Sequence, residues 1–183
     1  MTTEINFNPF PFLRSQKIIL RKLKDTDNID LSKLRSDKRV NEFLDRPDHL
    51  SEEDAGKLIS KLNEGIDSNE YIIWAISLSG DENLIGTICL WNLDIEYRLA
   101  EIGFELMPEF QQKGLMSEAI DLVVNYAFSS MRIKRIEGFA NEKNQRAFKV
   151  MERSGFTRDK SIESDIKSNE PDFVNIAAYK LEN

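Results

Sequence analysis

The residues best suited to chemistry lie at one junction, where an apolar run, residues 99–107, leads through a polar turn into a helix after Gly114. The first backbone N–H groups of a helix have no partner inside it, and the helix dipole makes that end positive. Glycine lets the backbone approach an anion closely, while Gln111, Gln112 and Lys113 add side-chain donors. These features predict a phosphate-binding turn. The alternative is a plain turn ahead of an amphipathic helix, because the chain has neither a Walker nor a dinucleotide glycine pattern.

Two carboxylates on the same run are candidates for a general base. Glu101 and Glu105 are four residues apart, so the alternation of a strand puts both on one face. A carboxylate near an amine can remove its proton. Glu101 is the first candidate and Glu105 the second, and the alternative for both is a solvated or salt-bridged strand residue.

The other reactive and aromatic side chains favour structural roles. Cys89 lies inside an apolar run, which favours a small core residue over an acyl carrier. His49 precedes a helix cap and is expected in a loop, from which it could still contact an acceptor. Trp74 and Trp91 lie in central strands, where the core is the favoured place for them.

Composition excludes several classes of protein. The chain has 183 residues, 25 basic and 32 acidic side chains, a formal net charge of −7 and 40% hydrophobic residues. This length fits one domain, residues 1–183, and the apolar content excludes disorder throughout. The single cysteine cannot form an internal disulfide, which suits a reducing compartment. One His and one Cys cannot build a usual zinc site, so we expect no metal, although a carboxylate site for Mg²⁺ or Ca²⁺ stays formally open.

Charge and hydropathy also limit the partners. An acidic balance argues against binding along a nucleic-acid backbone, although one short loop could hold a single anion. No run of about 18 apolar residues could span a membrane, and residues 1–17 lack the order of a signal peptide. We therefore expect a cytoplasmic protein without membrane or nucleic-acid partners.

The elements around the junction are read from periodicity and caps. Ser51 begins a capping pattern, and the apolar positions after it follow a helical stripe. Helices are expected at residues 28–35, 51–66, 114–128 and 145–153; strands at 17–24, 71–78, 84–93, 99–107, 132–139, from Phe156 and at 173–181; and a charged connection at 158–172. This order predicts an α+β (mixed α/β) fold in which the three strands from 71 to 107 form an antiparallel meander.

Residues 111–119, QQKGLMSEA, resemble the Q/R-x-x-G-x-G/A acyl-CoA loop of the GNAT superfamily of N-acetyltransferases. Five further segments, residues 18–21, 84–87, 100–106, 135–137 and 150–156, resemble the RimJ/RimL branch, the ribosomal-protein N-terminal acetyltransferases. The resemblance spans residues 17–181 and leaves residues 1–16 as an N-terminal arm.

This resemblance implies a mostly antiparallel twisted sheet, splayed between two strands and flanked by about four helices. The pantetheine arm of acetyl-CoA would lie between the splayed strands, with one backbone N–H near the thioester oxygen. The implied cofactor-binding residues are Leu106 and Met107 on the strand; Gln111, Gln112, Lys113, Gly114, Leu115, Met116 and Ser117 around the pyrophosphate; and Asn144, with Asn141 and Ala147 as weaker assignments. For Asn144 a plain helix N-cap is the alternative, and the two roles are compatible.

The sequence departs from the family pattern at two positions. Met116 replaces the last small residue of the loop, and Met151 stands where many members carry a tyrosine that protonates the departing thiolate. Another group, or water, would then supply that proton.

The implied reaction is direct attack of a primary amine on acetyl-CoA, without a covalent enzyme intermediate. The first expected acceptor is the N-terminal α-amine of a ribosomal protein. The alternatives are a small amine such as a polyamine, aminoglycoside or amino acid; a non-catalytic acyl-CoA sensor; and a nucleotide-binding protein that uses the same loop. Homodimers are common among such enzymes, but nothing in the sequence locates an interface.

Overall fold

The computed structural model describes residues 5–169 and 175–183. Its strands are β1 (Leu13–Arg14), β2 (Ile18–Arg21), β3 (Ile72–Leu78), β4 (Gly86–Asp94), β5 (Leu99–Leu106), β6 (Arg135–Asn141), β7 (Thr157–Arg158) and β8 (Ile176–Glu182). Its α-helices are α1 (Asn28–Ser36), α2 (Lys38–Asn41), α3 (Glu52–Asp67), α4 (Leu115–Ser129), α5 (Gln145–Arg153) and α6 (Lys160–Asn169). None of these helices, within the described residues, is both long and apolar enough to cross a bilayer.

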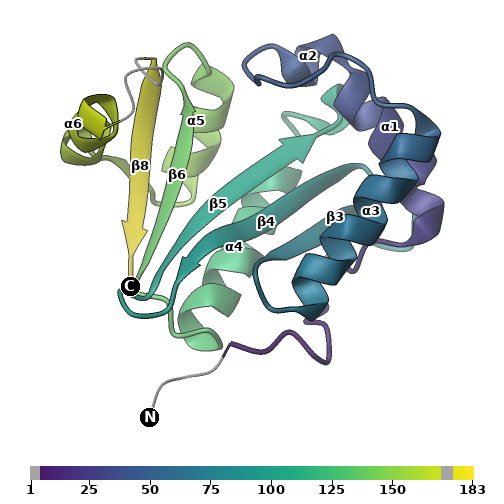
Figure 1. Ribbon diagram of the computed structural model, residues 1–183, viewed down its shortest axis with the longest axis horizontal. Helices are drawn as coiled ribbons and strands as arrows, with labels where there is room; N and C mark the ends of the chain where they lie inside the picture. The colour runs from purple at the N-terminus through teal and green to yellow at the C-terminus, as the bar shows by residue number, and fades with distance from the viewer. Residues whose placement is uncertain (1–4, 170–174) are drawn as a thin grey trace.

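The strands form one sheet in the order β1-β2-β3-β4-β5-β6-β8-β7 (Figure 1). Every neighbouring pair is antiparallel except β5 and β6, which are parallel and joined through α4. The mixed, mostly antiparallel fold and the meander from β3 to β5 are therefore confirmed. In Figure 1, α4 lies behind the sheet, while α3 lies in front of β3 with α1 packed beside it.

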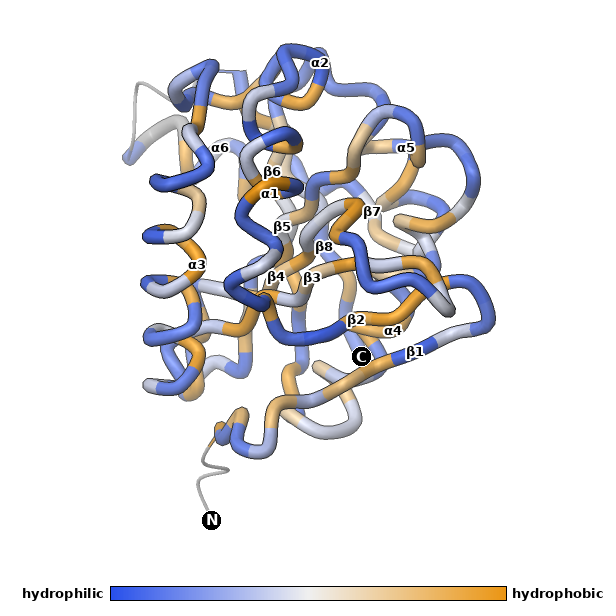
Figure 2. The backbone as a smooth tube through the Cα atoms, turned by 90° about the vertical axis from the view of Figure 1, so that its right-hand side faces the viewer, coloured by the Kyte–Doolittle hydropathy of each residue, from blue (hydrophilic) through white to orange (hydrophobic). Residues whose placement is uncertain are grey.

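Packing on the two faces follows from the apolar stripes of the helices. Trp74 of β3 is fully buried and meets the Tyr126 ring of α4 edge-on, at 5.8 Å between centroids. On the other side, α3 starts as its sequence predicts, because the Ser51 hydroxyl accepts from the Asp54 N–H at 3.0 Å. Hydrophobic and hydrophilic residues alternate along α3 in Figure 2, as in a helix with one buried face.

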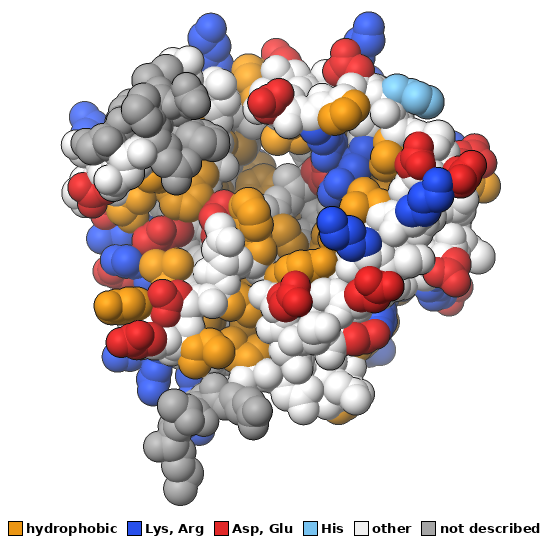
Figure 3. Space-filling view, in the orientation of Figure 1, with side chains coloured by type: hydrophobic (Ala, Val, Ile, Leu, Met, Phe, Trp, Pro, Cys, Tyr) orange, Lys and Arg blue, Asp and Glu red, His pale blue; other side chains and the backbone are white. Residues whose placement is uncertain are grey.

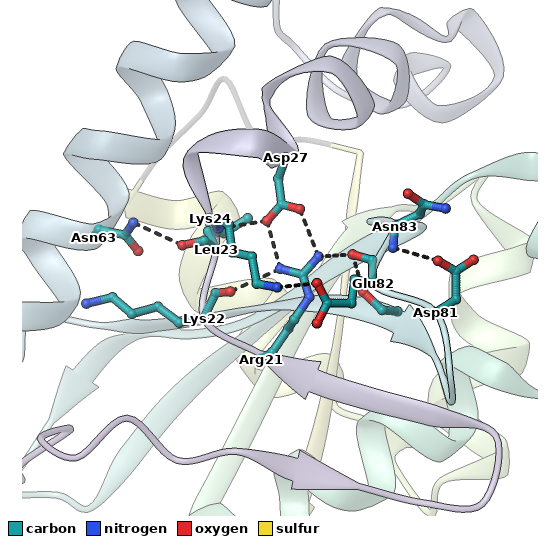
Figure 4. A network of polar contacts seen from close by, with 10 residues as sticks. Arg21, Lys22, Leu23, Lys24, Asp27, Asn63, Asp81, Glu82 and Asn83 are labelled. Atoms are coloured by element: carbon teal, nitrogen blue, oxygen red, sulfur yellow. Dashed lines mark hydrogen bonds and ion pairs between the residues drawn. The ribbon is translucent and has the colours of Figure 1, made fainter.

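A buried ion pair fixes the start of α1 to the sheet (Figure 4). Both guanidinium ends of Arg21 donate to the Asp27 carboxylate at 2.8 Å, and the two side chains are about 95% buried. Arg21 also donates to the Glu82 carbonyl, in the turn between β3 and β4. The bidentate pair ties β2 to the start of α1. With the bond to Glu82, Arg21 also holds the β3–β4 turn in place.

The structure corrects three expectations. Residues 160–169, expected within a charged connection, form α6, because the Asp159 carboxylate accepts from the Ser161 and Ile162 N–H groups as an N-cap. Trp91, expected in the core, is 44% exposed, since β4 extends beyond the helices that cover its first half. The expected strand at 173–181 begins at Ile176, and residues 173 and 174 lie outside the described residues.

The feature that matters most for function is the separation of β5 from β6. Their ladder contains three pairs, from Leu99↔Arg135 to Glu101↔Glu137. By contrast, β6 pairs with β8 along its whole length to Asn141. Past this last shared pair, which we call the vertex, the two strands diverge, as Figure 1 shows.

Candidate active site

A cavity of about 550 Å³ opens between the ends of β5 and α4 on one side and α2 and α5 on the other. Figure 3 shows this face hollowed between the same parts of the molecule. The lining residues are Arg39, Val40, Phe43, Leu44, Phe104, Glu105, Leu106, Gln111, Gln112, Gly114, Leu115, Met116, Ser117, Asn144, Arg146, Ala147, Lys149, Val150 and Arg153. Ten of the predicted site residues therefore line one cavity.

The start of α4 presents free donors to this cavity. Gly114 has a left-handed φ of +78°, which glycine adopts without strain, and nothing lies within 4 Å of where a Cβ would be. The first paired N–H of the helix belongs to Glu118, which donates to the Gly114 carbonyl at 3.1 Å. In the described structure, the N–H groups of the three intervening residues, 115–117, have no protein partner. This end of the cavity can therefore bind an anion through the backbone.

The edge of β5 that faces β6 also carries free backbone groups. The Met107 N–H donates at 2.9 Å to the carbonyl oxygen of Ile85, the residue before β4, on the opposite edge. Since N–H groups along a strand alternate between its two edges, those of Phe104 and Leu106 point toward β6. Among the described residues no strand pairs with β5 there, because the β5–β6 ladder stops at Glu101. Met107, predicted to contact the cofactor, thus has its N–H occupied and does not line the cavity.

Basic side chains of α5 line the opposite wall. Arg146, Lys149 and Arg153 are spaced i, i+3 and i+7, so they share one face of the helix. Arg146 also forms an ion pair with Glu42, which follows α2, across the mouth of the cavity. Sequence reading missed these cations, although their helical spacing was a usable signal. They give the cavity a basic wall in a protein of net charge −7.

Asn144 caps α5 and faces the same cavity. Its side-chain oxygen accepts from the Ala147 N–H at 3.1 Å, so the expected N-cap is present. Gln111, at the other wall, donates to the Leu106 carbonyl at 2.9 Å and holds the turn against β5. Lys113 and Asn141 lie outside the lining: the Lys113 ammonium sits 5.5 Å from the Phe110 ring centre, and Asn141 accepts from the Lys143 N–H.

Glu105 lines the cavity, but its carboxylate is engaged. One oxygen accepts from Arg35 at 3.0 Å and from the Thr87 hydroxyl at 3.1 Å, and the other pairs with Arg46 at 2.8 Å. Both oxygens of this carboxylate are thus occupied by protein partners. Glu105 therefore serves to fix α1 and residue 46 against β5, which matches the salt-bridged alternative.

Glu101 lies at the vertex, outside the cavity lining and three residues before Phe104. It shares the face of Glu105, opposite to α4, because the register Trp74↔Ile88↔Phe104 turns Phe104 toward that helix. Burial raises the pKa of the Glu101 carboxyl, an Asn92 amide donating at 2.9 Å lowers it, and the neighbouring Glu137 raises it further. Of the two candidate carboxylates, Glu101 is the one that no cation of the described residues pairs with.

Met151 occupies the other side of the vertex. It is 99% buried, and its sulfur would lie 2.8 Å from a Cβ on Gly138 of β6, so the glycine makes room for it. A thioether has no proton to donate. Cys89 is no substitute donor or nucleophile, since burial raises the pKa of its thiol to about 12. His49 is exposed and does not line the cavity.

These features fit coenzyme A. The free N–H groups after Gly114 and the basic face of α5 match its phosphates, and the unpaired edge of β5 matches the amides of pantetheine. Among the described residues, no group of three or more His, Cys, Asp or Glu side chains could hold a metal ion.

Comparisons with known proteins agree with this geometry. A family model described as "Acetyltransferase (GNAT) domain" matches residues 17–157. YoaA of Bacillus subtilis (strain 168), named as an uncharacterized N-acetyltransferase, is 30% identical over 150 residues, which cover 82% of this chain and 85% of YoaA.

Two solved structures share the fold. RimJ of Mycobacterium smegmatis, in complex with CoA-disulfide, has a TM-score of 0.76 at 15% identity and covers 94% of this chain and 86% of its own. Spermidine N-acetyltransferase from Vibrio cholerae, in complex with CoA and spermine, has a TM-score of 0.72 at 20% identity, with coverages of 92% and 96%. With the family model spanning most of the chain, the protein belongs to the GNAT family of acetyl-CoA-dependent N-acetyltransferases.

Proposed function

We propose that this enzyme acetylates the N-terminal α-amine of a protein, with a ribosomal protein as the first candidate. The observation that carries the proposal is the opening between β5 and β6. The free N–H groups after Gly114 lie in the cavity at the open end of the two strands, and Glu101 belongs to the last pair of their ladder at the other end. A long acyl carrier bound at one end would thereby bring its thioester to the base at the other.

Binding would use the backbone more than side chains. The N–H groups of Leu115, Met116 and Ser117 would hold the pyrophosphate, so the bulk of Met116 does not remove the donors. The basic face of α5 would neutralise phosphate charge, and the Asn144 amide would donate to pantetheine. Lys113, Asn141 and Met107 lie outside this cavity and are the weakest assignments.

The chemistry follows from the groups at the vertex. Acetyl-CoA supplies a thioester whose carbonyl carbon accepts the amine. Glu101 would take a proton from the acceptor ammonium, freeing the nitrogen lone pair for attack. The Phe104 N–H, which faces the opening, would donate to the oxygen as it gains negative charge. Since Met151 cannot protonate the departing sulfur, water would do so.

The acceptor side supports a polypeptide end. In Figure 1 none of the described helices is drawn in front of β5 and β6 near the vertex. The exposed Trp91 lies directly opposite Glu101 on β4 and could pack against the side chain of a first residue.

A small polyamine is the second candidate. Glu101 and Glu137 lie side by side on the face turned away from α4, which favours a cationic acceptor. The spermidine N(1)-acetyltransferase of Escherichia coli (strain K12) is 26% identical over 77 residues, 42% of this chain.

A thiol-release assay with acetyl-CoA tests the proposal. Peptides copying ribosomal-protein N-termini are compared with the same peptides blocked at the α-amine, and with spermidine. We expect release with free peptides alone and a large fall in kcat for Glu101→Gln, with acetyl-CoA affinity unchanged. Release with spermidine only would favour the second candidate, whereas CoA binding without release for any amine would show a sensor. Thermal stabilisation by ATP or NAD in preference to CoA would overturn the acyl-CoA assignment.

A further inference from the structure

Glu137 lies next to the proposed base at the vertex. The pair Glu101↔Glu137 is the last of the β5–β6 ladder. Paired residues of parallel strands point to the same face, and neighbouring strands are about 4.8 Å apart. Two carboxylates therefore stand side by side where the strands begin to diverge. The family resemblance and the cavity assign no role to Glu137.

The surroundings of the two carboxylates are unequal. Arg135 approaches Glu137 at 3.0 Å, and Lys180 lies opposite it on β8, itself paired with Asp159 at 3.0 Å. Glu101 has the Asn92 amide and the Trp91 ring on its β4 side, and among the described residues no cation is paired with it. On its own strand and on β4, the nearest further titratable groups are Glu105, held by two arginines, and the neutral Cys89 thiol.

We infer that Glu137 is a positioning residue for the transfer: its carboxylate, beside Arg135 and Lys180 and paired across the ladder with Glu101, makes Glu101 the preferred proton acceptor at the vertex. This inference rests on the proposed function, in which Glu101 is the base. When the acceptor arrives as an ammonium, its N–H proton passes to a Glu101 oxygen, and the electron pair of that bond stays on nitrogen. Glu137 exchanges no proton in this step.

The titration of the pair agrees with this assignment. Burial raises the pKa of both carboxyls, and Glu137 raises that of Glu101 further. The pKa of Glu137 is lowered by Arg135 and Lys180 and raised by Asp159. Two interacting carboxyls titrate as a unit, and the two cations lie beside Glu137 rather than Glu101.

The test is the pH dependence of kcat in the thiol-release assay with the best acceptor. A base must be deprotonated to work, so activity falls on the acid side near its pKa. Glu137→Gln removes a neighbouring negative charge, which lowers the pKa of Glu101 and moves the acid limb to lower pH, by about one unit. Arg135→Gln removes a positive charge beside the Glu137 carboxylate, so the negative charge near Glu101 is less compensated. The acid limb of the pH profile should then move to higher pH. Glu96→Gln, in the exposed β4–β5 turn, is the matched control and moves neither.

Opposite movement of the limb in the two variants supports the inference. An acid limb that stays in place in both, while Glu101→Gln abolishes it, would overturn the role of Glu137 and leave the base assigned. A limb that persists in Glu101→Gln would overturn the proposed base itself. Because Arg135→Gln keeps Glu137 in place, it provides a result even where Glu137→Gln is too unstable to assay, and thermal unfolding of each variant shows which case holds.

Discussion

Asn144 has two roles that substitutions can separate. Its oxygen caps α5 by accepting from the Ala147 N–H at 3.1 Å, and its amide lines the cavity. Asn144→Ala removes both, and loss of a cap costs about 1 kcal/mol, or roughly 2–4 °C in Tm for a chain of this size. Asn144→Asp keeps the cap and places an anion at a helix N-terminus, so Tm should hold or rise.

Binding of CoA should respond differently from stability. Asn144→Asp loses a donor worth about 0.5–1.5 kcal/mol and adds a negative charge to a basic cavity. We expect its Kd for CoA, measured by calorimetry, to rise at least about tenfold, or about 1.4 kcal/mol. Asn144→Ser keeps a cap without the charge and should show only the smaller loss. Unchanged CoA affinity in the Asp variant would reduce Asn144 to a helix cap and refute its binding role.

Two further predictions concern ion pairs. Asp27→Ala leaves the buried Arg21 guanidinium without its carboxylate and should lower the free energy of unfolding, measured in urea, by about 3–5 kcal/mol. The double variant Arg21→Met with Asp27→Leu removes both charges and should be near neutral. A loss below about 1 kcal/mol in the single variant would contradict this reasoning. Arg146→Gln should weaken CoA binding a few-fold, because it removes a cation from the cavity wall. Glu42→Gln frees Arg146 from its ion pair and should not weaken binding. Equal weakening by both variants would show that CoA binding depends on the Arg146–Glu42 ion pair and not on the cation itself.

Local patterns predicted most of the elements. The Ser51 cap, the stripe that follows it and the meander from β3 to β5 all depend on residues close in the chain, and the structure confirms them. The anion-binding character of the turn before α4 was also readable, because it needs only a strand, a glycine and a helix start. Helix α6 was missed because its one clear signal was a single N-cap, Asp159, within a charged segment.

Other features depend on distant partners and could not be read locally. Trp91 looks like a core residue in its strand, yet whether a helix covers it depends on where α1 and α3 end in space. Glu101 and Glu105 are indistinguishable by alternation. Arg35 and Arg46, from elsewhere in the chain, occupy Glu105 and leave Glu101 as the base candidate.

The sequence alone was enough to predict a GNAT-like loop, a mixed fold and a pair of candidate carboxylates, because each depends on residues that are close together in the chain. Folding added the vertex, where the ladder of β5 with β6 stops after Glu101↔Glu137. It also placed the basic face of α5 against the cavity and gave the two carboxylates unequal partners. The reason is physical. Strand pairing and charge compensation are set by groups far apart in the chain, and their proximity exists only once the sheet has formed.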